Sequence, residues 1–98
     1  MTLPLRTIGI IGAGQMGNGI AHVCALAGYE VLLHDLNEER LKAGLATING
    51  NMARQVSRGL IDEAKRAAAL EKIQPETDVA VVAQADLVIE AATENEEI

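Results

Sequence analysis

Three glycines and one aspartate carry the clearest chemical signal in this chain. Gly12, Gly14 and Gly17 form a Gly-x-Gly-x-x-Gly pattern in the stretch IGIIGAGQMGNGIA, and Asp35 follows 18 residues after Gly17. Glycine permits a tight turn, lets a phosphate approach the backbone and allows a helix to pack closely on a strand. The N–H groups at the start of a helix attract anions. The pattern therefore predicts a pyrophosphate-binding turn between a strand and a helix.

The aspartate indicates which dinucleotide this turn would hold. Asp35 falls just past a predicted strand at residues 30–34, where a carboxylate can accept hydrogen bonds from both ribose hydroxyls of an adenosine. It would also repel a 2′-phosphate, so the sequence predicts NAD rather than NADP as the cofactor. A glycine triplet alone can be a packing turn. The strand before it, the helix after it and the acid beyond the second strand favour cofactor binding.

Apolar runs and capping signals predict strands that alternate with helices. Short runs that are apolar on both faces suit the middle of a parallel sheet. The predicted strands are residues 7–11, residues 30–34, a short segment near residues 73–74, and residues 87–90. The first predicted helix follows the glycines and ends at Gly28, and its buried stripe would be Met16, Ile20, Val23 and Ala27.

A longer helix is predicted after Asp35. Asn37 is its expected N-cap, and Leu36 and Leu41 stand at the positions of a hydrophobic staple. The residues expected on its buried face are Leu41, Leu45, Ile48, Met52 and Val56.

Smaller elements follow a predicted turn at residues 58–59. Asp62 would cap a helix that runs to about Lys72, and Pro75 would help to end it. Its weaker apolar stripe would be Ala67, Leu70 and Ile73. A brief helix is expected at residues 79–83, and residues 93–96 fit a capping box that opens another helix.

The spacing of these elements predicts the fold class. About forty residues separate Asp35 from the third and fourth strands, twice what a simple crossover needs, and the excess is a helical hairpin. We predict an α/β fold: the N-terminal portion of a Rossmann-type, doubly wound parallel sheet, with a helical hairpin inserted after the second strand.

The amino-acid composition limits the kinds of partner that the protein can bind. The 98 residues suffice for one domain at most, and fourteen acidic against eight basic residues give a net charge of −6, which argues against nucleic-acid binding. No apolar run approaches the roughly 20 residues of a membrane span, and the N-terminus does not resemble a secretory signal. Cys24 is the single cysteine. We therefore expect a cytoplasmic protein with no membrane or nucleic-acid partner.

Three segments together resemble a known family. IGAGQMGNGIA, the helical hairpin after Asp35, and ADLVIEAATENEE look like the N-terminal part of an L-3-hydroxyacyl-CoA dehydrogenase, most like the bacterial 3-hydroxybutyryl-CoA dehydrogenases. The resemblance covers nearly the whole chain. It is more specific than the glycines alone, because other β-hydroxyacid dehydrogenases share the first segment and lack the long hairpin.

The resemblance implies a cofactor site. Asp35 would bind the adenosine ribose, and Glu94, after the fourth strand, would contact the cofactor. Glu94 also follows the carboxyl end of a parallel strand, where open α/β sheets bind ligands. The residues that match the family's pyrophosphate loop are Gly12, Ala13, Gly14, Gln15, Met16 and Gly17.

The resemblance also implies what lies outside this chain. In the family a histidine general base, a glutamate that orients it, the remaining strands and a helical C-terminal domain that dimerises follow further along, and a lysine is expected just after residue 98. Residues 1–98 would be the N-terminal part of an NAD-binding domain, inactive alone. The complete enzyme, a homodimer, would oxidise a 3-hydroxyacyl-CoA by hydride transfer to NAD. The alternative from another class is a non-catalytic dinucleotide-binding module.

Other reactive side chains are expected to be structural. His22 and His34 have no visible acid or nucleophile partner, Cys24 has no paired histidine, and Asp86 and Glu90 flank a strand without forming an acid/base pair. We assign no catalytic or metal-binding residue. Four basic residues of the hairpin are expected to form a solvated face, although the family uses this hairpin to hold CoA: Arg54, Arg58, Lys65 and Arg66.

Overall fold

The computed structural model describes residues 5–91, which form one four-stranded sheet with its helices. In chain order the elements are β1 (Thr7–Ile11), α1 (Gln15–Leu26), β2 (Glu30–His34), α2 (Glu38–Ser57), α3 (Glu63–Glu71), β3 (Ile73–Glu76), α4 (Val79–Val82) and β4 (Leu87–Glu90). The strands are parallel in the order β3-β2-β1-β4. The predicted α/β fold is confirmed. The capping box at residues 93–96 and Glu94 lie outside the described residues.

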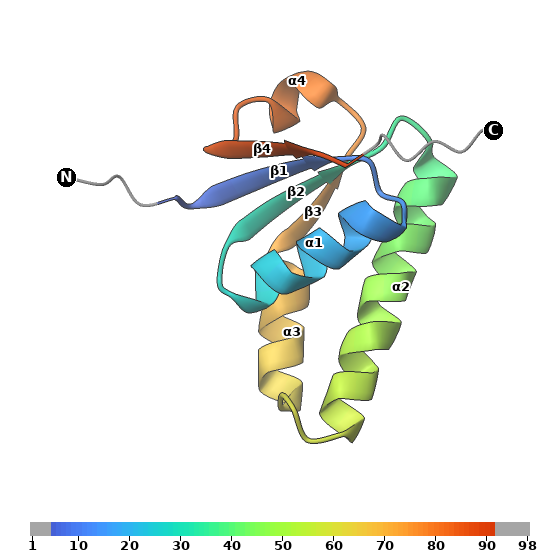
Figure 1. The fold of residues 1–98 in the computed structure, drawn as a ribbon, viewed down its shortest axis with the longest axis vertical. Helices are drawn as coiled ribbons and strands as arrows, with labels where there is room; N and C mark the ends of the chain where they lie inside the picture. Colours follow the sequence, from blue (N-terminus) through green and yellow to red (C-terminus); the bar gives the residue numbers. More distant parts are fainter. Residues whose placement is uncertain (1–4, 92–98) are drawn as a thin grey trace.

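Helices cover both faces of the sheet, as Figure 1 shows. α1 and the α2–α3 hairpin lie on one face, and the short α4 lies on the other. Neighbouring residues of β1 show the two sides: a Cβ on Gly9 would meet Val82 of α4, whereas Ile10 packs toward Gly17 of α1. The hairpin is the insertion predicted between the second and third strands.

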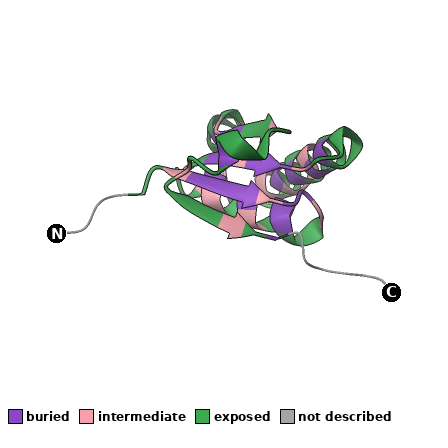
Figure 2. Ribbon diagram, turned by 90° about the horizontal axis from the view of Figure 1, so that it is seen from above, coloured by how far each residue is buried: buried purple, intermediate pink, exposed green. Residues whose placement is uncertain are grey.

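The core lies between the sheet and the two helices α1 and α2 that cover one of its faces. Ile10, Val31 and Leu33 of the central strands are fully buried there, together with Ile48 and Met52 of α2. Figure 2 shows this concentration of buried residues in the central strands, while much of α4 is exposed. No helix within residues 5–91 combines the length and the apolarity needed to cross a bilayer.

The buried face of α1 differs from the prediction. Met16 and Val23 are 47% and 66% exposed, and the residues that face the sheet include Gly17, Ala21 and Ala25. The reason is steric, because α1 packs so close to β1 that only small side chains fit between them. The helix is therefore rotated from the orientation that the large apolar residues alone would favour.

The start of α2 confirms one prediction and corrects another. The Asn37 side chain accepts hydrogen bonds from the N–H groups of Glu39 and Arg40, so it is the N-cap as predicted. Leu36 is 83% exposed and forms no staple with the buried Leu41. Leu36 lies inside a turn that is closed by a hydrogen bond from the Asn37 N–H to the Asp35 carboxylate, and this turn leaves the Leu36 side chain pointing outward. Of the other residues expected on the buried face, Ile48 and Met52 are buried, and Leu45 and Val56 are partly buried.

Two strands and α3 also differ in detail from the prediction. Pro75 lies within β3, an edge strand that tolerates proline, and does not end α3. In α3 it is Ala69 that is buried, whereas Ala67 is exposed. Leu87 and Val88 of β4 are about 40% exposed, because β4 is an edge of the sheet within residues 5–91.

Candidate functional site: a phosphate turn beside an acidic side chain

The phosphate turn, residues 12–17, joins β1 to α1. Gly12 has a φ of 110°, in the region that favours glycine, and its N–H donates to the carbonyl oxygen of His34 at 2.7 Å. A Cβ on Gly17 would lie 1.7 Å from the carbonyl oxygen of Gly12. Both glycines are therefore required by the backbone of the turn itself.

Gly14 has a different role in this turn. It is the N-cap of α1, and its extended backbone, with a φ of −71°, is one that any residue adopts. Backbone strain therefore does not require glycine here. What the missing side chain provides is open backbone at the start of the helix, which a pyrophosphate needs in order to approach closely.

The first turn of α1 presents the positive end of the helix to this open backbone. Among the described residues no side chain caps it, and no acidic residue lies in it. The N–H groups of Gln15, Met16 and Gly17 have no acceptor within the helix. These groups and the helix dipole favour an anion even in a chain of net charge −6. The turn fits the pyrophosphate of a dinucleotide.

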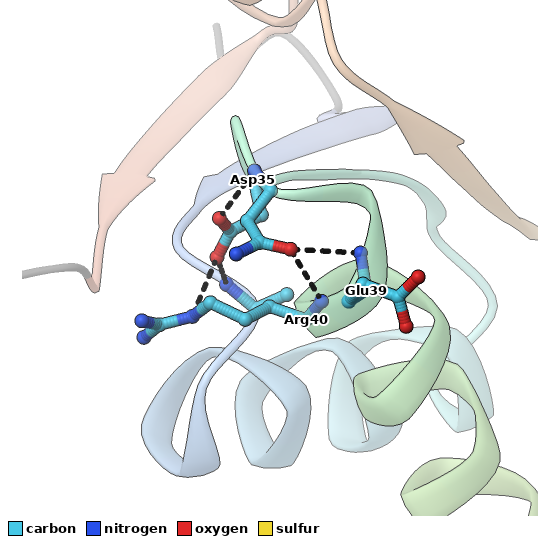
Figure 3. A network of polar contacts seen from close by, with 5 residues as sticks. Asp35, Glu39 and Arg40 are labelled. Atoms are coloured by element: carbon cyan, nitrogen blue, oxygen red, sulfur yellow. Dashed lines mark hydrogen bonds and ion pairs between the residues drawn. The ribbon is translucent and has the colours of Figure 1, made fainter.

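Asp35 follows β2 directly and binds the phosphate turn, as Figure 3 shows. Its Oδ2 accepts a hydrogen bond from the Ala13 N–H at 3.0 Å, and its Oδ1 accepts one from the Asn37 N–H at 3.0 Å. Arg40 Nε lies 3.5 Å from Oδ2. The Asp35 side chain is only 13% exposed. Its carboxylate is thus held in one orientation beside the turn.

The same contacts set the ionisation of Asp35. Partial burial acts to raise the pKa of the carboxyl, but the two amide donors of Asn37 and Ala13, followed by the charges of Arg40 and His34, outweigh it. The net effect holds the pKa of Asp35 below its ordinary value. Asp35 is therefore an anion at neutral pH, so both of its oxygens can accept hydrogen bonds from ribose hydroxyls.

A groove of about 410 Å³ runs beside the phosphate turn. Its lining residues come from the turn and α1 on one side and from α2 on the other: Ala13, Gly14, Gln15, Asn18, Arg40, Ala43, Gly44 and Thr47. α2 can come this close because Gly44 has no side chain. A Cβ at this position would lie only 2.8 Å from the carbonyl oxygen of Ala13. Asn18 is 8% exposed, so a nearly buried amide lies beside the space that a pyrophosphate would take.

Comparison with known families decides what this turn is. The sequence profile of the family "3-hydroxyacyl-CoA dehydrogenase, NAD binding domain" matches residues 7–98. The chain belongs to this family. Because the family is an NAD-binding domain, the prediction of NAD as the cofactor, made from the glycines and Asp35, is confirmed.

Individual relatives of this NAD-binding domain are dehydrogenases of acyl-CoA compounds. The 3-hydroxybutyryl-CoA dehydrogenase of Bradyrhizobium diazoefficiens is 52% identical over 98 residues, which are 100% of this chain and 33% of that protein. The 3-hydroxyadipyl-CoA dehydrogenase of Escherichia coli is 39% identical over 98 residues, which are 100% of this chain and 21% of that protein. The chain thus spans about a third or less of the length of these relatives.

A solved structure shows the same fold. The (S)-3-hydroxybutyryl-CoA dehydrogenase of Ralstonia eutropha superposes with a TM-score of 0.89 at 41% sequence identity, over 95% of this chain and 33% of that one. The Rossmann-type fold of this NAD-binding domain is therefore shared with a dehydrogenase of the family that the sequence resembles.

The other reactive side chains of the NAD-binding domain have structural partners. His22 Nε2 lies 2.8 Å from Gln55 Oε1, which joins α1 to α2. The Nδ1 of the buried His34 lies 3.0 Å from the carbonyl oxygen of Glu76, so Nδ1 carries the proton. Burial raises the pKa of the Cys24 thiol, which opposes nucleophilic reactivity. That none of these residues is catalytic stays a prediction.

The structure separates the two acids that flank the last strand. Asp86 precedes β4, and its Oδ2 accepts hydrogen bonds from the N–H groups of Arg6 and Thr7 at 2.8 and 3.0 Å. Glu90 lies at the other end of the same strand, as the last residue of β4. Asp86 thus ties the start of β4 to the start of β1. Within residues 5–91 no cluster of three or more histidine, cysteine or acidic side chains could hold a metal ion.

The basic residues of the hairpin are not gathered into one site. Arg66 bonds Glu63 and Asn49, which ties α3 to α2. Arg54 bonds Asn51 within α2, and Arg58 is exposed at the C-cap of that helix. Arg66 is therefore a structural link, whereas Arg54, Arg58 and Lys65 lie on the exposed surface.

Two residues at the site were missed by sequence reasoning. Arg40 pairs with Asp35, and Asn18 lines the groove. The sequence did contain a signal for Arg40. A cation in the first turn of a helix opposes the helix dipole, so its presence there indicates a nearby acidic partner. No signal existed for Asn18, since the predicted stripe placed α1 in a different rotation.

Proposed function

We propose that the gene product carrying this NAD-binding domain oxidises the 3-hydroxyl group of an (S)-3-hydroxyacyl-CoA to the 3-oxo group by hydride transfer to NAD, in fatty acid or butanoate metabolism. 3-Hydroxybutyryl-CoA is the proposed substrate. The observation that carries the proposal is an intact phosphate turn with an ionised Asp35, in a chain 52% identical to a 3-hydroxybutyryl-CoA dehydrogenase.

The residues of the turn have distinct proposed roles. The N–H groups of Gln15, Met16 and Gly17 bind the pyrophosphate, while Gly12, Ala13 and Gly14 shape the backbone that receives it. Asp35 accepts the ribose hydroxyls and orients the adenosine. Glu94, which lies outside the described residues, is proposed to contact the cofactor.

Catalysis divides between this domain and the rest of the protein. NAD, when bound, supplies the hydride acceptor, and the residues described here bind and orient it. The general base that removes the hydroxyl proton lies in a part of the protein beyond residue 98. We propose that residues 1–98 are the N-terminal part of the NAD-binding domain, followed by its remaining strands and a helical C-terminal domain, in a cytoplasmic homodimer.

The test uses the purified product of the complete gene. NADH and NADPH are titrated by fluorescence, and NADH consumption is then followed with 3-oxobutyryl-CoA as substrate. We expect tighter binding of NADH than of NADPH, and turnover that requires the CoA thioester. Equal affinity for both nucleotides would contradict the role of Asp35. Binding of NADH without turnover would favour a non-catalytic dinucleotide-binding module, and turnover of free 3-hydroxy acids would favour a different β-hydroxyacid dehydrogenase.

A further inference from the structure

The surroundings of the Asp35 carboxylate have the composition of an anion site. Two backbone N–H groups, from Ala13 and Asn37, donate to its two oxygens at 3.0 Å each. The Arg40 guanidinium lies 3.5 Å away through Nε. These donors come from the turn after β1 and from the start of α2, and they converge on one point, as Figure 3 shows. Two amides and a guanidinium are also a common set of ligands for a phosphate group.

The position of Arg40 is not explained by the stability of α2. It is the third residue of a helix that begins at Glu38 with Asn37 as its N-cap. A cation there opposes the helix dipole, and the capping box favours glutamate or glutamine at this place. Arg40 instead turns toward Asp35 and lines the groove beside Gly14 and Gln15. Its charge is thus directed at the nucleotide site.

We propose that the Asp35 carboxylate is an internal anion that fills a phosphate-sized site, and that Arg40 determines specificity at the adenosine ribose. When the carboxylate is present, Arg40 holds it in position to accept hydrogen bonds from the ribose hydroxyls. When the carboxylate is removed, Arg40 binds a 2′-phosphate in its place. This inference rests on the proposed NAD site. It adds that the Asp35 charge is what excludes NADP, because Arg40 already provides the cationic half of a 2′-phosphate site.

Competition for the same donors explains the expected exclusion of NADP. A 2′-phosphate would meet the Asp35 carboxylate at close range, and like charges that are partly buried repel strongly. Removal of the carboxylate frees the N–H groups of Ala13 and Asn37 and leaves Arg40 without its partner. The Arg40 side chain is 61% exposed and flexible, so its guanidinium can then reach a phosphate bidentately.

The experiment compares 2′,5′-ADP with 5′-AMP, which differ only by the phosphate at C2′, in the product of the complete gene. Calorimetry gives both affinities for the wild type, Asp35→Ser, and Asp35→Ser combined with Arg40→Leu. We expect Asp35→Ser to bind 2′,5′-ADP roughly ten-fold or more tightly than the wild type does. The Arg40→Leu change should abolish that gain. Asp35→Ala, which also removes the carboxylate from the site, gives the same comparison if the serine variant does not fold.

A matched control removes a different positive charge from the same helix. Lys42 is exposed and lies outside the groove, so Lys42→Leu in the Asp35→Ser background should leave the gain intact. The inference is overturned if folded Asp35→Ser or Asp35→Ala protein gains no affinity for 2′,5′-ADP, or if Lys42→Leu abolishes the gain as fully as Arg40→Leu does. A wild type that binds neither NADH nor 5′-AMP would instead contradict the proposed function, on which this inference depends.

Discussion

Gly17 of α1 packs directly against the backbone of Gly12, so that a Cβ on Gly17 would lie 1.7 Å from the Gly12 carbonyl oxygen. We expect Gly17→Ala to destabilise the protein by about 1–3 kcal/mol or more, because a backbone contact must shift to admit the methyl group. Nucleotide binding should weaken as well, since that shift moves the phosphate turn. Urea unfolding and NADH titration measure the two effects.

Gly19 supplies a control on the same helix. A Cβ on Gly19 would meet nothing within 4 Å, so Gly19→Ala should stabilise the protein by about 0.5–1 kcal/mol through helix propensity. NADH affinity should be unchanged in this variant. Equal losses in both variants would show that the close contact at Gly17 has no special role.

Gly14→Val separates binding from folding. The extended backbone at Gly14 accommodates valine without strain, but the new side chain would occupy the space above the first turn of α1. We expect NADH binding to be abolished while the urea midpoint changes little. If affinity is retained, the turn serves packing and not phosphate binding.

Asp35→Ala tests the ribose contact. Hydrogen bonds to a charged acceptor contribute roughly 1.5–3 kcal/mol, so NADH affinity should fall about ten- to a hundred-fold. The loss should be smaller for a nucleotide that lacks ribose hydroxyls, and titration with a dideoxyribose analogue measures that difference. An equal loss for both ligands would assign Asp35 to the shape of the turn alone.

The stability that Asp35 contributes should depend on pH in a defined direction. Its folded pKa lies below the ordinary value of 3.8, so the contribution is present above the ordinary value and is lost as pH falls through the folded pKa. The difference in unfolding free energy between wild type and Asp35→Asn should be constant from about pH 7 to pH 5 and shrink below about pH 4. Hydrogen bonds from the amides of Arg6 and Thr7 likewise lower the pKa of Asp86, but this effect cancels in the difference. A difference that grows in acid would contradict the assignment.

Residues 1–98 expressed alone should be marginally stable and show no dehydrogenase activity. Leu87 and Val88 of the edge strand β4, and Val79 and Val81 of α4, leave apolar surface exposed. Thermal unfolding and an NADH assay with 3-oxobutyryl-CoA test the two statements separately. A cooperative melt at high temperature would show that the half-sheet is a self-sufficient domain, and turnover would assign a role to His22 or His34.

Sequence reasoning was most successful where one residue type determines the local backbone. The tight turn at Gly12, where φ is positive, and the side-chain caps at Asn37 and Asp62 are local properties, and the structure has all three. The phosphate turn and Asp35 could therefore be placed together before any tertiary contact was known.

The sequence prediction was wrong where packing between elements decides the outcome. Periodicity favoured Met16 and Val23 as the buried side of α1, but the short distance to β1 selected the smaller residues. The pairing of Arg40 with Asp35 likewise depends on how the start of α2 lies against the phosphate turn. Such contacts follow from the assembled sheet and not from any window of sequence.

The α2–α3 hairpin has a consequence for the order in which the sheet assembles. β1 and β2 are joined through the single helix α1, whereas the hairpin separates β2 from β3, and β4 returns from far along the chain to pair with β1. The entropy cost of closing a loop rises with its length, and contacts between distant residues slow folding. The β1–α1–β2 unit, which contains the phosphate turn and ends just before Asp35, should therefore form early. The outer strands would then add to a template that already carries the nucleotide-binding backbone.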